Sequence, residues 1–223
     1  MSAFWLRFIA LATMLIDHIG AILLPQFTFL RIIGRISFPI YAFLIVNGYR
    51  HTRNRWQYLL RLILFALISE VPHDVAFYMH GQGVIEFSNQ NIFFTLGLGL
   101  LAMMARDWLE QRGVVRSQAN FMVFVPASIV AELLGFSYGA VGILTLFLFD
   151  LRWDKVIPTW MAGVALTLVF YAMTPIQAYG ALAMIPISMY NGKPGLRNPL
   201  LQYGFYLFYP VHLLALYAVH SML

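Results

Sequence analysis

Asp17 and His18 stand side by side in MLIDHIG, residues 14–20, a stretch that otherwise has the composition of an apolar helix. An ionisable side chain within lipid costs on the order of 3 kcal/mol, so those that occur there usually face the protein interior and have partners. Imidazole is also the side chain best suited to remove a proton from an attacking amine or hydroxyl. We therefore predict a catalytic pair in which His18 is the general base and Asp17 orients or charges its ring.

Other segments of the chain are expected to deliver polar side chains to the same depth. Arg31 and Arg35 are four residues apart, so they share one face of a helix. Guanidinium groups there are suited to stabilise an oxyanion or to bind an acidic acceptor. The remaining residues of this predicted acceptor or oxyanion site are Glu70, Asp74, Asn91 and His212.

Structural alternatives to a catalytic site stay open. Buried Asp17, His18 and Arg35 also fit an ion-pair network that performs no chemistry. Three polar residues at the end of the third predicted span fit solvated loop positions instead: His73, Asp74 and His80.

A second set of residues is predicted to hold the phosphates of a donor. Arg7 lies eleven residues before His18, which is about three helical turns, so both fall within about 20° of one face and roughly 16 Å apart. NGKPG, residues 191–195, adds exposed amides together with the side chains of Asn191 and Lys193, which are suited to bind phosphate. A plain Gly/Pro turn is the alternative for this loop.

The six histidines show no metal-binding spacing, and no HExxH, GxSxG or P-loop motif occurs, so no metal is expected.

The elements that must position these groups are membrane helices. The chain is 61% hydrophobic and only 10% charged, with a mean hydropathy of +0.76, a balance that soluble domains do not approach. It has no cysteine, which excludes disulfides and thiolate chemistry. Because about 20 apolar residues cross a bilayer as a helix, we predict one all-α transmembrane domain over residues 1–223, a polytopic bundle of about nine helices. The expected spans are 3–23, 28–48, 56–75, 91–105, 119–135, 137–150, 156–173, 175–190 and 201–221.

Basic residues between these spans predict the orientation. Alternate loops hold ten Lys and Arg residues, whereas the loops around 24–29, 76–90, 135–138 and 174 hold none. Basic loops stay cytoplasmic, so the N-terminus should be cytoplasmic and the C-terminus outside. This distribution explains the pI near 9.6 without nucleic acid, which we do not expect as a partner. The ten are Arg50, Arg53, Arg55, Arg106, Arg112, Arg116, Arg152, Lys155, Lys193 and Arg197.

Several motifs resemble, in order and over nearly the whole chain, the TraX family, whose name-giving member is the conjugative pilin N-acetylase. They include LRFIALATMLIDHIGAIL, LRIIGRISFPIYAFLIVNGYRHTRNRWQYLLRLILFALISEVPHD, NIFFTLGLGLLA, YGAVGILTL, MYNGKPG and FYLFYPVHLLAL. The family looks related to membrane acyltransferases that include bacterial O-acetylases of surface sugars and a lysosomal heparan glucosaminide N-acetyltransferase. Those O-acetylases carry Arg or Lys, ten residues and then His on their first helix, so the resemblance implies Arg7 and His18 as the matching pair. Asn47 departs from the family, where an acidic residue often stands.

The resemblance implies a multi-pass acetyltransferase of the bacterial inner membrane. It would take acetyl groups from cytoplasmic acetyl-CoA, its donor substrate, and place them on an extracytoplasmic protein or glycan, such as a pilin N-terminal amine or a surface sugar. Two alternatives stay open: a proton-coupled transporter, because buried Asp, His and Arg also build proton paths, and a non-enzymatic assembly factor for a surface appendage. Transfer of label from acetyl-CoA separates the three.

Overall fold

The computed structural model describes residues 1–78, 88–153, 157–196 and 198–223, and within these ranges the chain is helical and contains no β-strand. Lys155, Arg197 and His80 lie outside them. The helices are α1 (Ala3–Ile22), α2 (Thr28–Gly34), α3 (Ser37–His51), α4 (Arg55–Tyr78), α5 (Ile92–Gln111), α6 (Arg116–Leu133), α7 (Gly139–Trp153), α8 (Thr159–Met173), the 3-10 helix η1 (Pro175–Ala183), α9 (Met184–Ser188) and α10 (Pro199–His220).

Three stretches are long and apolar enough to cross a membrane: Ala3–Ile22, Thr28–His51 and Ile92–Gln111. The helix Thr159–Met173 is apolar but shorter. Every predicted span coincides with helix over most of its described length, so the all-α class is confirmed. The nine-span arrangement and its orientation stay predictions.

The second predicted span is interrupted where α2 gives way to α3, at Arg35 and Ile36. Pro39 explains the break, because proline has no N–H to donate to the carbonyl of Arg35 four residues earlier and its ring crowds that carbonyl. The proline instead falls in the first turn of α3, where an N–H has no helical partner to lose. The regular helix is therefore interrupted at Arg35, one of the predicted site residues, although Arg35 and Ile36 both keep helical dihedral angles.

The eighth predicted span is not a continuous α-helix. Residues 175–190 form the 3-10 helix η1 and the single-turn α9, with Pro175 at the start of η1. Gly180 permits a close approach here, because a Cβ at this position would lie 2.9 Å from the Phe170 ring and 3.1 Å from the carbonyl oxygen of Arg35. This irregular segment thus lies against α8 and against the break between α2 and α3.

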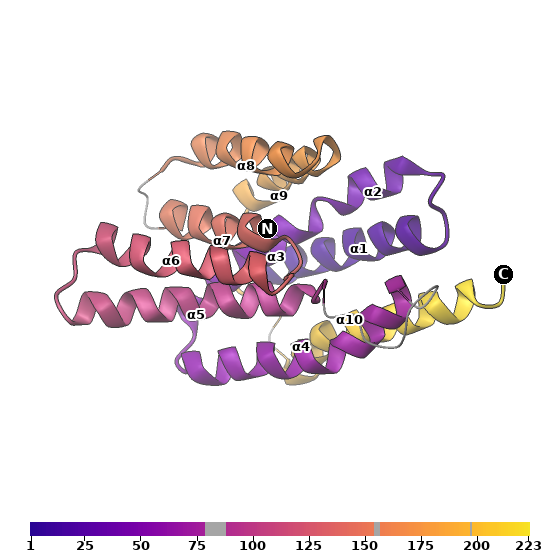
Figure 1. Cartoon of the computed structure of the whole chain (residues 1–223), viewed down its shortest axis with the longest axis horizontal. Coiled ribbons are helices and arrows are strands. Elements are labelled where there is room, and N and C mark those ends of the chain that lie inside the picture. Colours follow the sequence, from indigo (N-terminus) through magenta and orange to yellow (C-terminus); the bar gives the residue numbers. More distant parts are fainter. Residues whose placement is uncertain (79–87, 154–156, 197) are drawn as a thin grey trace.

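Figure 1 shows the longer helices lying roughly side by side, with the turn between α5 and α6 at the left end and the turn between α1 and α2 at the right end. Helix α10 runs beside α4 along the lower edge, although the two are far apart in sequence. Helix α3 is central, since eleven of its fifteen residues are buried. It packs against α1, α5 and α7, and so joins the first helix of the chain to helices from its middle.

Several basic residues that we counted as loop charges are held in ion pairs. Arg106 and Asp150 are fully buried and joined to each other, and Arg50 also donates to Asp150. Asp107 accepts from Arg55 at 2.8 Å and from the guanidinium of Arg106 at 2.8 Å. These charges therefore tie α3, α4, α5 and α7 together, and reading them only as topology signals was incomplete. Removing one partner from such a buried pair leaves an uncompensated charge.

Candidate functional site

His18 of α1 is paired with His212 of α10. Nδ1 of His18 lies 2.6 Å from Nε2 of His212, and the two rings are parallel within 1°, with centroids 4.9 Å apart. Nδ1 of His212 lies 2.6 Å from the carbonyl oxygen of Phe208. A carbonyl only accepts, so Nδ1 of His212 carries its proton and, in the neutral ring, Nε2 accepts from Nδ1–H of His18. The lone pair of His18 is thereby assigned to Nε2, the nitrogen that a general base would use.

Two aromatic rings hold His18 from its sides. Phe77 meets it edge to face, with centroids 5.4 Å apart and an interplanar angle of 78°. Tyr209 does the same at 6.1 Å and 67°. Together with His212, these contacts hold the His18 imidazole in the observed orientation.

Asp17 is engaged by both predicted arginines. Its Oδ2 accepts from Nη1 of Arg31 at 2.6 Å and its Oδ1 accepts from Nη2 of Arg35 at 2.5 Å. Gly34 makes room for this, because a Cβ there would lie 2.2 Å from Oδ1 of Asp17. Asp17 therefore braces α1 against α2, and His212 occupies the position beside the His18 ring that we expected Asp17 to take.

These residues border a cavity of about 600 Å³, which we call the His18 cavity. Arg31 and Arg35 line it together with Asp17 and His18, so four of the predicted site residues meet in one space. Its other polar lining residues are Ser37, Tyr41, His73, Asn89, Ser137, Tyr138, Thr174, Gln177 and Tyr209.

Glu70, Asp74 and Asn91 do not line either cavity that holds predicted site residues. Asn91 begins α5 by accepting from the Phe93 amide at 3.0 Å, and its side-chain nitrogen donates to Glu70. Asp74 is 1% exposed and lies beside the ring of His73, 3.4 Å from its Nδ1. The solvated-loop alternative is therefore wrong for His73 and Asp74, which are buried side chains of α4.

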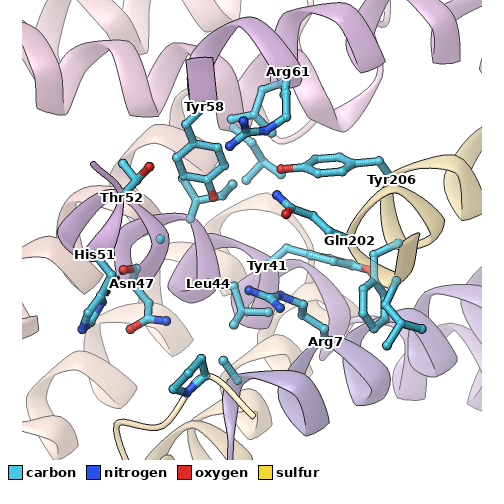
Figure 2. A pocket seen from close by; sticks show the side chains of 18 of the residues that line it. Arg7, Tyr41, Leu44, Asn47, His51, Thr52, Tyr58, Arg61, Gln202 and Tyr206 are labelled. Atoms are coloured by element: carbon cyan, nitrogen blue, oxygen red, sulfur yellow. Dashed lines mark hydrogen bonds between the residues drawn. The ribbon is translucent and has the colours of Figure 1, made fainter. Parts of the chain in front are cut away.

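A second space of about 460 Å³, the Arg7 cavity, opens among α1, α3, α4, α5, α10 and residues 190–196 and 198. Figure 2 shows Arg7 and Arg61 extending into it from opposite walls, with Tyr41, Tyr58 and Tyr206 between them. No Asp or Glu lines this cavity, and within the described part of the chain neither arginine forms an ion pair. Nε of Arg61 is buried without a hydrogen-bond partner among those residues. The cavity thus presents two uncompensated positive charges.

The predicted phosphate loop borders this cavity through its backbone. Ala3 and Phe4 at the start of α1 donate to the carbonyls of Lys193 and Pro194, at 2.9 and 3.1 Å. Gly192 and Pro194 line the space, whereas the Lys193 side chain is exposed. Asn191 accepts from the Lys193 amide at 3.1 Å, as expected of a tight turn. Contact of Asn191 or Lys193 with phosphate stays a prediction.

The two cavities share a wall. Met14, Tyr41, Ile92 and Tyr209 line both of them. Arg7 and His18, on the same helix, face opposite sides of this wall. The space that holds Arg7 and Arg61 and the space that holds the His18 imidazole are therefore separated by these four side chains.

Sequence reasoning missed two parts of this site. It gave no role to Arg61, although this arginine falls inside the predicted span 56–75 and a cation at that depth needs an interior environment. It placed His212 among acceptor residues and did not pair it with His18. The aromatic series at residues 203, 206 and 209 before His212 was the available signal, since it marks a polar face of α10 at middle depth.

The long apolar helices and the interior polar cavities define a helical membrane protein. The chain belongs to the TraX family: the family model described as TraX protein matches residues 2–220. It is 31% identical to the probable fimbrial assembly protein FimC, serogroup H1, of Dichelobacter nodosus, over 95% of this chain and 93% of that protein. It is 32% identical to an uncharacterized protein of Rickettsia prowazekii (strain Madrid E) over 42% of this chain and 33% of that protein. No solved structure shows a significant match.

Proposed function

We propose that this protein is a pilus-related membrane acetyltransferase that moves an acetyl group from acetyl-CoA to an extracytoplasmic acceptor. The observation that carries the proposal is the wall shared by two cavities. One holds two arginines that form no ion pair with the described residues, and the other holds an oriented imidazole. Membership of the TraX family and similarity to a probable fimbrial assembly protein support a pilus-related role.

The Arg7 cavity is the proposed donor site. Its volume of about 460 Å³ falls within the range of about 300–1,000 Å³ that is usual for small-molecule sites. Arg7 and Arg61 would pair with the phosphates of coenzyme A, and the tyrosine-lined space between them would take its apolar arm. The predicted orientation, with basic loops in the cytoplasm, would open this cavity toward the side where acetyl-CoA is available.

In the proposed reaction, an acceptor amine or hydroxyl in the His18 cavity attacks the thioester carbonyl carbon. Nε2 of His18 takes the acceptor proton as the new C–N or C–O bond forms. The C–S bond then breaks, and the proton passes from His18 to the coenzyme A thiolate. Throughout, Nδ1–H of His18 donates to Nε2 of His212. This bond keeps Nε2 of His18 in position to take the acceptor proton.

A proton-coupled carrier is the second candidate, because two cavities separated by a thin wall also fit alternating access. An assembly factor without enzymatic activity is the third candidate, in line with the name of the fimbrial assembly relative. Neither alternative requires an acetyl donor.

Acetyl transfer from isotope-labelled acetyl-CoA by the purified protein in lipid nanodiscs tests the proposal. The probes are a short peptide with a free N-terminal amine and a free hexosamine. We expect label on one of them, and none with His18→Ala, whereas His220→Ala on the same helix as His212 should behave as wild type. Absence of transfer by folded protein that binds acetyl-CoA would overturn the enzymatic proposal.

A further inference from the structure

The two arginines beside Asp17 differ in how fully their donors are used. Arg35 donates from Nε to the Arg31 carbonyl at 3.2 Å, from Nη1 to Gln177 at 2.7 Å and from Nη2 to Asp17 at 2.5 Å. All three of its nitrogens are therefore committed. Its side chain is only 12% exposed.

Arg31 uses a single nitrogen. Nη1 donates to Oδ2 of Asp17 at 2.6 Å and to the Asp17 carbonyl oxygen at 3.0 Å. Among the residues described, Nε and Nη2 of Arg31 have no hydrogen-bond partner, and neither is a buried orphan. The side chain is 31% exposed and lines the His18 cavity. Nε–H and Nη2–H point in parallel, and this edge of a guanidinium matches the two oxygens of a carboxylate.

The charges that line the His18 cavity do not balance. Arg31 and Arg35 contribute two positive charges and Asp17 one negative charge, which leaves a formal charge of +1 when the histidines are neutral. Glu70 and Asp74 are not among the residues that line the cavity. Glu70 is engaged by Asn91, and Asp74 lies beside His73. An excess positive charge in a low-dielectric site attracts an anion strongly.

We infer that the acceptor is an acidic peptide, whose side-chain carboxylate binds the Nε–Nη2 edge of Arg31 while its amine reaches His18. The choice of an amine acceptor rests on the proposed function, whereas the binding of the carboxylate does not. The cavity of about 600 Å³ is large enough for a few residues. Arg35 is a positioning residue here, because its committed nitrogens hold Asp17 and thereby Arg31.

Binding of two matched peptides to the purified full-length protein tests this inference. Ala-Gly-Glu-Ser and Ala-Gly-Gln-Ser, both amidated at the C-terminus, differ only in the side-chain carboxylate. We expect the Glu peptide to bind about tenfold more tightly, a preference that Arg31→Gln should remove. Arg31→Lys keeps the ion pair with Asp17 but lacks the two parallel N–H donors of a guanidinium. The preference of this variant for the Glu peptide should therefore fall below about threefold. The control is Arg53→Gln, an exposed arginine outside both cavities.

Equal affinity for the two peptides in the wild type, or an unchanged preference in folded Arg31→Gln or Arg31→Lys, would overturn the inference. So would a failure of both peptides to bind, or tighter binding of glucuronate or inorganic phosphate than of the Glu peptide. Preferential binding without acetyl transfer would overturn the proposed function alone. Acetyl transfer to both peptides with equal kcat/KM and equal affinity would overturn this inference alone.

Discussion

His18 and His212 form a hydrogen bond of 2.6 Å between parallel rings, although 194 residues separate them in the chain. Because His212 is itself tied to the Phe208 carbonyl, the bond orders the proton positions of both imidazoles. The free lone pair then belongs to Nε2 of His18. In many enzymes a carboxylate orients the histidine that acts as the base. Here the imidazole of His212 takes that orienting position beside His18.

Substitution of the two histidines should have unequal effects. His18→Ala should lower acetyl transfer by at least about 100-fold, because the base is lost. His212→Gln should lower kcat about tenfold with little change in the KM for acetyl-CoA, because it loosens the ring but leaves the base. Steady-state transfer from labelled acetyl-CoA measures the rates of both variants. Near-normal rates in both would mean that His18 and His212 have a structural role only.

The rate of acetyl transfer should fall as the pH is lowered. Protonation of His18 at Nε2 removes the lone pair that accepts the proton of the acceptor, so the acid side of the profile loses activity. The acid limb should follow the ionisation of the His18–His212 pair as a unit, because the two rings share a hydrogen bond. Initial rates over a pH series, with folding checked at each pH, test this, and a rate that rises on acidification would contradict it.

Acetyl-CoA should stabilise the purified protein against heat through the Arg7 cavity. Arg7→Gln and Arg61→Gln should each weaken its binding about tenfold, because each removes one of two uncompensated cations. Lys193→Gln should have a smaller effect, since its side chain is exposed outside the cavity lining. Thermal-shift titrations measure the affinities, with Arg53→Gln as the matched charge control. Unchanged affinity in both cavity variants would move the donor site elsewhere.

Tyr209 should control passage of the acetyl group across the shared wall. Tyr209→Leu shortens a side chain that lines both cavities, so water should reach the thioester and hydrolysis of acetyl-CoA without acceptor should rise severalfold. Tyr209→Phe keeps the ring and should hydrolyse acetyl-CoA as slowly as wild type. Release of free thiol, followed with a thiol reagent, distinguishes the two. A slow Tyr209→Leu variant that still transfers acetyl normally would show that the wall does not limit access.

The orientation follows from the basic loops and is open to direct measurement. Reporter fusions after Arg53 and after Arg112 should be cytoplasmic, whereas a fusion at Leu223 should be external. Arg112 is followed by Gly113, which has a positive φ of 88° and open space around its Cα, so a fusion there disturbs little packing. A cytoplasmic C-terminus would mean that the number of spans is wrong, and the depths assigned to the site residues would have to be derived again.

The sequence alone determined the class of the protein and several residues of the candidate site. Composition and apolar run length predict membrane helices, because both are local quantities. The i,i+4 spacing of Arg31 and Arg35 likewise predicts that they act on one side of a helix, and both do meet Asp17. Pro39 was visible too, but its effect on the second span depended on where α3 restarts.

Only the tertiary structure decided the partners. Neighbouring residues of an α-helix point about 100° apart, so Asp17 and His18 face different elements even though they adjoin in sequence. Asp17 meets α2, and His18 meets α10 at the far end of the chain. Which side chains converge across such separations depends on how whole helices pack, and no local pattern records it. For the same reason, only the packing of α1 beside α4 shows that Arg7 and Arg61 line one cavity.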